Sequence, residues 1–240
     1  MFDEQDFSEE RYRALLKMSL KQGYKPIFFG EEKGTKRFIL WRHDVDLELN
    51  PALKMGRIEA EERIRSTYFL MTRSWFYNLF TKEGEFLVQK LLQFGHQVGL
   101  HCDLGVARGE SISDKFVTER VHQDFSLITT FFGRDVFKPI VSFHNPPQAV
   151  FKRFFPGFYS TYSEHFFDEI KYLSDSNRIW REGPIEDWLS EDKVSQFSIL
   201  LHPFIWAYGG KTMPEAISYY LKSRTSELHH KLEEDDIYIQ

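Results

Sequence analysis

The distribution of apolar residues along the chain predicts short buried strands that alternate with amphipathic helices. Residues 38–41 (FILW) are apolar at every position, as in a strand covered on both faces. Residues 113–132 instead carry Val117, Val121 and Phe125 on one helical stripe. By the same criteria we expect strands at residues 38–41, 66–71, 97–103, 139–145, 157–163, 171–176 and 197–203, and helices at 8–22, 51–65, 84–94, 113–132 and 213–234. Residues 26–36 are expected to form a loop or a short hairpin.

Alternation of strands and helices at this spacing predicts an α/β protein with parallel strands joined by crossover helices. About seven strands favour a closed or nearly closed (β/α) barrel over the alternative, a doubly wound open sheet. No GxGxxG sequence follows the first strand, which removes one reason to prefer a dinucleotide-binding fold. A chain of 240 residues is normal for one such barrel. We therefore expect a single domain over residues 1–240, with the helix at 8–22 packed on a barrel core at 37–235.

Composition narrows the classes of partner. The formal net charge is −5 and the basic residues are scattered, so the chain lacks the basic stripe of a nucleic-acid binder. Its single cysteine, Cys102, excludes an intramolecular disulfide. No apolar run approaches the ~20 residues of a membrane-spanning helix, and the acidic N-terminus does not resemble a signal peptide, so we expect a cytoplasmic protein. Most of the 24 Phe, 11 Tyr and 5 Trp residues are expected in the core, with a minority lining a saccharide or ring-shaped ligand.

Polar residues collect where the predicted strands end. In parallel α/β folds these ends form one rim, and active sites lie on it, so the side chains should converge. The segments concerned are RHDVD (42–46), HCD (101–103), SFHNPP (142–147), SDSN (174–177) and LHP (201–203).

A pair of carboxylates on the first of these segments points to a metal. Asp44 and Asp46 are two residues apart on a strand and face the same side, so they would repel each other without a cation or a proton between them. One carboxylate can ligate a metal while the other takes a proton from water. His101 and Asp103, also two residues apart, add imidazole and carboxylate ligands that suit zinc or a similar divalent ion.

The expected roles of the remaining histidines depend on whether they lie at a strand end. His202 ends an apolar strand and is placed to donate a proton to a leaving group. His144, before Asn-Pro-Pro, is a candidate metal ligand or substrate contact. Cys102 should face away from its two neighbours by strand alternation. The other histidines fall on helices, loops or turns and are expected to be structural: His96, His122, His165, His229 and His230.

At these residues the sequence resembles the polysaccharide deacetylases, the carbohydrate esterases with a NodB homology domain, over residues 37–205. The resemblance implies a deformed (β/α) barrel of about seven parallel strands. RHDVD is similar to the family's first motif and implies that Asp44 is the catalytic base and Asp46 a metal ligand. GHQVGLH is similar to its second motif and implies a ligand at His101. LLHP is similar to its Leu-His motif and implies that His202 is the general acid.

The chain departs from that family at one metal ligand. The family's second metal histidine lies four residues after the first, and Gly105 occupies this position here. Asp103, His144 or His43 then completes the site, or the site binds metal weakly or not at all. His43 ranks last, because strand alternation turns it away from Asp44.

Five further residues are predicted to contact the substrate. The family's Arg-Pro motif is replaced by SFHNPP, and SDSNRIWREGP resembles a segment of a branch associated with surface-polysaccharide genes. Arg181 can clamp a carboxylate or phosphate, and packing or a surface ion pair is its alternative role. The full set of predicted substrate residues is Arg42, Asn145, Ser176, Trp180 and Arg181.

Three functions remain open at this stage. The first is a divalent-metal hydrolase, with zinc as the expected metal, that deacetylates an N-acetylated sugar or a surface-polysaccharide precursor. The second is a non-catalytic sugar-binding or polysaccharide-assembly protein on the same fold, which Gly105 favours. The third is a phosphoesterase with two metals, for which the ligands look too few.

Overall fold

The structure, a computed structural model, describes residues 6–107, 110–191, 193–208 and 211–234. Its strands form one sheet, in the order β6-β5-β4-β3-β2-β8-β7 with β1 beside β2, and every pairing between them is parallel. The strands are β1 (Lys25–Pro26), β2 (Phe38–Val45), β3 (Ser66–Met71), β4 (Gln97–Cys102), β5 (Phe137–Phe143), β6 (Tyr159–Ser160), β7 (Lys171–Ser174) and β8 (Gln196–Leu201).

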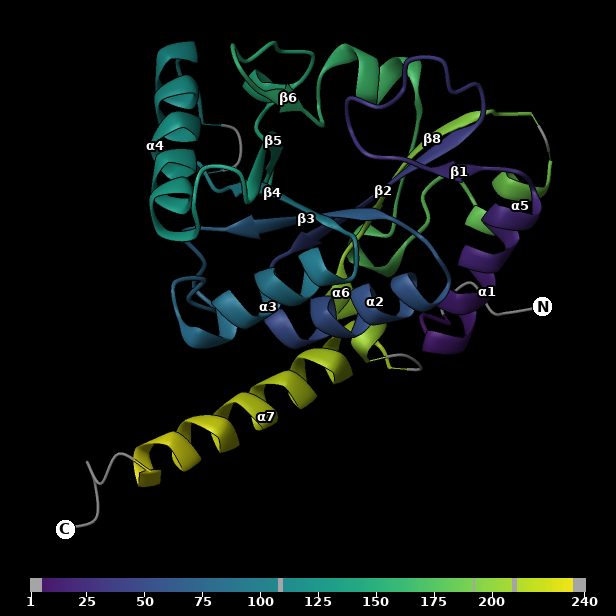
Figure 1. Cartoon of the computed structure of the whole chain (residues 1–240). Coiled ribbons are helices and arrows are strands. Elements are labelled where there is room, and N and C mark those ends of the chain that lie inside the picture. The colour runs from purple at the N-terminus through teal and green to yellow at the C-terminus, as the bar shows by residue number, and fades with distance from the viewer. Residues whose placement is uncertain (1–5, 108–109, 192, 209–210, 235–240) are drawn as a thin grey trace.

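The strand order identifies the sheet as a deformed barrel. From β2 to β6 each strand adds to the same side of its predecessor, and β8 returns to pair with β2. A doubly wound sheet would instead reverse its strand order at a switch point. The sheet curls with helices around it (Figure 1) and, within the described ranges, no pairing joins β6 to β7. The prediction of an α/β barrel with about seven parallel strands is confirmed.

Helices occupy the connections between the strands. Polar caps fix several of their starts: the Ser8, Thr81 and Ser113 side chains each accept a hydrogen bond from a backbone N–H in the first turn that follows. The α-helices are α1 (Glu9–Lys21), α2 (Leu49–Glu61), α3 (Lys82–Gln93), α4 (Asp114–Phe132), α5 (Ile185–Ser190), α6 (Pro203–Ala207) and α7 (Met213–Glu234). Short turns of 3₁₀-helix cover Gln148–Val150 and Ser176–Arg178, and one π-helical turn covers His165–Glu169.

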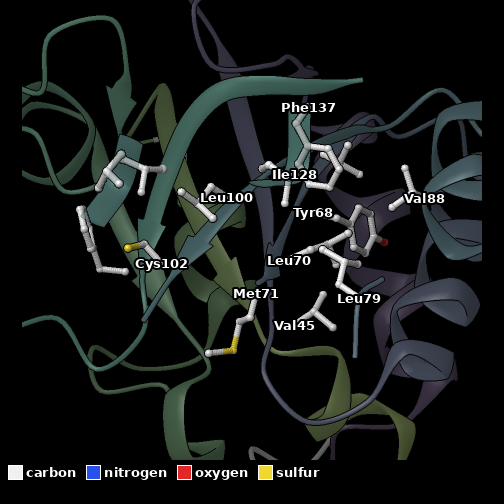
Figure 2. Close-up of a cluster of buried hydrophobic side chains, with 14 of the residues drawn as sticks. Val45, Tyr68, Leu70, Met71, Leu79, Val88, Leu100, Cys102, Ile128 and Phe137 are labelled. Carbon is white, nitrogen blue, oxygen red and sulfur yellow. The ribbon is translucent and has the colours of Figure 1, made fainter. Parts of the chain in front are cut away.

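Apolar side chains pack on both faces of the sheet. The largest cluster joins the outer face to α2, α3 and α4, with Val45, Leu70, Leu100 and Ile128 among its members (Figure 2). A second cluster packs α1, α5 and α6 against β2 and β8. A third, containing Leu40, lies on the inner face. Burial on both faces explains why the strands read as continuous apolar runs, and it leaves the strand ends as the place where polar groups reach solvent.

Some elements differ from the sequence predictions. Residues 27–36 form a loop, which is one of the two predicted alternatives, and not a hairpin, because β1 pairs in parallel with β2. The strands expected at 157–163 and 171–176 are shorter, since β6 has two residues and β7 has four. The helices α5 and α6 were not predicted. In the part of the chain that is described, no helix is long and apolar enough to cross a membrane.

A buried polar cluster lies on the outer face of β2. Glu59 of α2 is fully buried, and its carboxylate accepts hydrogen bonds from Tyr12 Oη (2.6 Å), Ser66 Oγ (2.6 Å), His43 Nε2 (2.7 Å) and Tyr68 Oη (2.5 Å). A carboxylate only accepts hydrogen bonds, so His43 must donate through Nε2–H. We call these five residues the Glu59 cluster. It fixes α1 and α2 to the sheet and turns His43 away from the rim.

Candidate active site

Six polar residues from different strands meet at the carboxyl ends of the sheet. β2 supplies Asp44 at its end and Asp46 directly after it, and β4 supplies His101. His144, Asp175 and His202 each follow the last residue of a strand, namely β5, β7 and β8. Parallel strands place these ends at one rim, which is why residues far apart in sequence are neighbours here.

Three of these residues form a group with the composition of a metal site. Asp46 Oδ1 lies 3.0 Å from His101 Nε2 and 3.2 Å from His144 Nδ1. All three ligand atoms lie within 4.8 Å of one another. The His101 side chain is buried, whereas the Asp46 and His144 side chains are 23% and 29% exposed, so an ion can reach the group from solvent.

The group fits a divalent transition metal. Zinc binds nitrogen and oxygen at about 2.0–2.2 Å, which places neighbouring ligand atoms about 3.0 Å apart in octahedral geometry and about 3.4 Å apart in tetrahedral geometry. The 3.0 and 3.2 Å separations lie in this range. Two imidazoles and one carboxylate are also the donor set that zinc accepts. Although burial alone would raise the pKa of Asp46, hydrogen bonds from His101 and His144 lower it strongly, so this carboxylate stays ionised.

Asp44 lies next to His101 of this group and is almost completely buried. Its Oδ2 accepts hydrogen bonds from Arg42 Nη2 (2.9 Å) and Ser142 Oγ (2.9 Å), and it lies 3.8 Å from His101 Nδ1. Burial alone would raise the pKa of Asp44, but the charges of Arg42, His101 and His202, together with the hydrogen bond from Arg42, lower it. Asp44 Oδ1 has no hydrogen-bond partner among the described residues, so an ionised oxygen is held free to accept a proton.

His202 lies on the opposite side of the Asp46 carboxylate. Its Nε2 is 3.9 Å from Asp46 Oδ2, and its Nδ1 is 2.6 Å from Oδ1 of the buried Asp175. Asp175 also accepts hydrogen bonds from the His202 backbone N–H and from Trp206 Nε1. Burial alone would lower the pKa of His202, but the charge and hydrogen bond of Asp175, together with the charges of Asp46 and Asp44, raise this pKa to about 9. The imidazole is therefore protonated at neutral pH and directs Nε2–H toward the metal group.

Replacing Asp175 with Asn should lower the pKa of His202. The amide removes the negative charge that favours the imidazolium, so we expect the pKa of His202 to fall from about 9 to about 6–7 in the metal-free protein. NMR titration of the imidazole Cε1–H signals measures this pKa directly. Asp187→Asn, on the exposed face of α5, serves as the control and should change nothing. An unchanged His202 pKa in Asp175→Asn would contradict the pairing.

The structure distinguishes the candidates for the third metal position. His144 joins Asp46 and His101. Asp103, predicted as a ligand, lies outside this group, because its Oδ1 accepts a hydrogen bond from the Gly105 backbone N–H (2.9 Å) and shapes the loop after β4. His43 faces the Glu59 cluster on the other side of β2, as alternation predicted.

Most of the predicted substrate residues have other contacts. Arg42 is fully buried and binds Asp44, so it positions the carboxylate instead of contacting a substrate. Trp180 is 9% exposed and packs in the cluster with α1 and α5. Asn145 Nδ2 lies 3.0 Å from His144 Nε2, and Ser176 Oγ lies 2.7 Å from Ser174 Oγ. Arg181 is exposed and its role stays a prediction.

Sequence reasoning did not assign roles to two residues of the site. Asp175 follows β7 within the segment SDSN, and Ser142 lies one residue before the end of β5. Both belong to the strand-end segments that the sequence singled out, so strand-end position was the available signal. What the sequence lacked was the pairing of Asp175 with His202 and of Ser142 with Asp44, which depends on the register between strands.

The chain is similar to proteins of known structure. No family model matches the chain, and no curated protein matches it. Among solved structures the chain is similar to a family 4 carbohydrate esterase from Bacillus anthracis, with 19% identity, 92% of this chain and 86% of the other covered, and a TM-score of 0.45. It is also similar to the chitin deacetylase of the fungal pathogen Colletotrichum lindemuthianum, with 15% identity, coverage of 77% and 81%, and a TM-score of 0.44.

Its structural neighbours are family 4 carbohydrate esterases and deacetylases. They are the group that the sequence motifs resemble. They include a pseudoenzyme from Bacillus anthracis, with 13% identity, coverage of 86% of this chain and 65% of the other, and a TM-score of 0.46. Activity has to be argued from the residues of the site itself.

Proposed function

We propose that this protein is a metal-dependent hydrolase that removes the acetyl group from an N-acetylated saccharide. The observation that carries the proposal is the Asp46–His101–His144 group, with Asp44 3.8 Å from His101 and His202 3.9 Å from Asp46. These positions supply a metal site, a proton acceptor and a proton donor around one point. The saccharide is inferred from the motifs RHDVD, GHQVGLH and LLHP, which resemble those of polysaccharide deacetylases.

The chemistry follows from the protonation states of the chain's own groups. A divalent cation such as zinc, bound by Asp46, His101 and His144, would polarise the acetyl carbonyl and make water a stronger acid. Asp44 accepts the proton of the attacking water through Oδ1, while Arg42 and Ser142 hold Oδ2 in place.

The second proton transfer completes the cleavage. His202 donates its Nε2 proton to the amide nitrogen as the C–N bond breaks, so that acetate and a free amine leave. Asp175 keeps this imidazole oriented and charged before the transfer. Because amines are poor leaving groups unless protonated, a histidine held in its acidic form at neutral pH suits amide hydrolysis.

The metal site is tested by titrating zinc into the wild type, His144→Ala and His165→Ala. The wild type should retain about one equivalent in elemental analysis after desalting. Mutation of a residue that only hydrogen-bonds a metal ligand typically weakens metal binding about 10–100-fold. Loss of His144, a proposed ligand itself, should therefore weaken zinc binding at least about 100-fold. His165, which pairs with Glu169 outside the site, is the matched control and should bind as the wild type does.

The same samples test the reaction through release of acetate from N-acetylglucosamine oligomers. We expect zinc-dependent release by the wild type and by His165→Ala. A wild type that takes up no metal and releases no acetate would overturn the proposal. The non-catalytic sugar-binding function, which Gly105 favours, would then take its place.

A further inference from the structure

The loop between β3 and α3, residues 72–81, exposes the most accessible tryptophan of the described chain. Trp75 is 94% exposed, and its neighbour Phe76 is 45% exposed. By contrast, Trp41, Trp180 and Trp206 are at most 9% exposed. A tryptophan presents a large apolar face, and a ligand that covers it would remove this area from water, which is favourable.

This loop is anchored to the strand end that carries the metal group. Ser74 Oγ donates a hydrogen bond to the backbone carbonyl of Asp46 (3.4 Å) and accepts one from the Tyr77 N–H (3.3 Å). Tyr77 is buried, and its hydroxyl donates to the Val45 carbonyl (2.8 Å) and accepts from the Met71 N–H (2.8 Å). Trp75 therefore lies between two residues fixed to the end of β2, on the same rim as Asp46.

We propose that Trp75 is a stacking surface for a pyranose ring adjoining the sugar that is deacetylated. The inference rests on the proposed function and narrows its substrate to an oligosaccharide of two or more units. The C–H face of a pyranose is apolar and flat enough to cover an indole ring, whose face is electron-rich. A loop that is already held in place loses little freedom when the sugar binds.

The charges of the loop favour a saccharide over a membrane surface. Segments that bind membranes combine exposed aromatic residues with several lysines or arginines. Residues 72–81 contain a single basic residue, Arg73, and its guanidinium is paired with the buried Asp124 (2.9 Å). The neighbouring loop adds the carboxylates of Asp46 and Glu48, which would repel anionic lipids.

The test compares binding of N-acetylglucosamine with binding of its β-1,4-linked tetramer by calorimetry. Asp44→Asn serves as the host chain, so that the saccharide is not consumed, and Trp75→Ala and Trp75→Phe are added to it. The matched control is Phe154→Ala, because Phe154 is 78% exposed but lines a pocket with Glu32, which precedes β2 at the opposite end of the sheet.

Trp75→Ala should weaken tetramer binding about tenfold and change monomer binding less than about twofold. Trp75→Phe, which keeps an aromatic face, should recover most of the tetramer affinity, and Phe154→Ala should match the host. Equal tetramer affinity with and without Trp75 would overturn the inference, as would a host that binds tetramer no better than monomer. Trp75-dependent binding to phosphatidylglycerol vesicles without saccharide binding would overturn it in favour of a membrane contact.

The outcomes separate this inference from the proposed function. Zinc binding and acetate release without any effect of Trp75 on the tetramer would remove only the stacking surface. Trp75-dependent tetramer binding by a chain that neither binds zinc nor releases acetate would overturn the hydrolase and leave a saccharide-binding protein.

Discussion

Asp44→Asn is expected to lower kcat for acetate release about 10³–10⁴-fold while leaving zinc content close to that of the wild type. The amide cannot accept the proton of the attacking water, whereas the three side chains proposed to bind the metal are untouched because Asp44 lies outside that group. Initial rates at saturating saccharide measure the loss. Elemental analysis of the same sample measures the zinc, so that loss of metal and loss of the base are distinguished.

The matched control is Asp103→Asn, which changes a neighbouring strand-end carboxylate that is not in the metal group. An asparagine Oδ1 can still accept the hydrogen bond from Gly105, so this variant should keep nearly full activity. Asp44→Asn also leaves the charge of the buried Arg42 without its partner, and circular dichroism at the assay temperature checks that the chain remains folded. Ser142→Ala keeps the Arg42–Asp44 pair and should reduce kcat more mildly, by about tenfold. Full activity in Asp44→Asn would contradict its assignment as the base.

Alternation along β2 was enough to sort several site residues before the structure was considered. Because side chains alternate between the two faces, Asp44 and Asp46 had to face one way and His43 the other. The structure confirms this orientation of His43, which binds Glu59. It also confirms the alternation predicted on β4, where Cys102 faces Asp124. The sequence predicted a substrate contact for Arg42 and not its buried pairing with Asp44, because burial depends on what the curled sheet encloses.

The choice among the metal ligands was beyond the sequence for a physical reason. It depended on the path of the loop after β4, where Gly105 adopts a positive φ of 65° and the Asp103 side chain bonds the loop backbone. That path withdraws Asp103 from the metal group. His144 enters instead because β5 pairs with β4, with Ser142 opposite His101, which brings the residue after β5 to the same rim. Such a pairing register is a property of the folded sheet and is not visible in the spacing of residues along the chain.

Trp180 shows a different limit of sequence reasoning. It lies close to the strand-end segment 174–177, which suggested a substrate contact, but it is buried in the cluster that includes residues of α1 and α5. Sequence gave no sign that a helix at Ile185–Ser190 would cover it, since α5 is only six residues long. A helix this short shows too few apolar residues at helical spacing to be predicted from the sequence. The buried cluster to which it contributes is therefore apparent only in the folded structure.

Glu59→Gln should cost about 3–5 kcal/mol of unfolding free energy at pH 7, measured from urea denaturation. The fully buried carboxylate accepts four hydrogen bonds, and an amide in its place would direct an N–H at groups that also donate. Glu61→Gln is the control on the same helix, because its exposed pair with Arg13 should be worth less than about 1 kcal/mol. A Glu59→Gln chain as stable as Glu61→Gln would show that the cluster contributes little.

The loss of unfolding free energy caused by Glu59→Gln should also become smaller at acidic pH. Burial alone would raise the pKa of Glu59, but its interactions with His43, His96 and Ser66 together lower the pKa to about 2 from an ordinary value of 4.5. A carboxyl whose pKa is lower in the folded state stabilises it fully above the unfolded value, and this contribution declines as the pH falls toward the folded value. The difference in stability between the wild type and Glu59→Gln should thus be constant from pH 7 to about 5 and shrink between about 4.5 and 2. A difference that grew on acidification would mean that the Glu59 cluster favours the protonated carboxyl, contrary to its four donors.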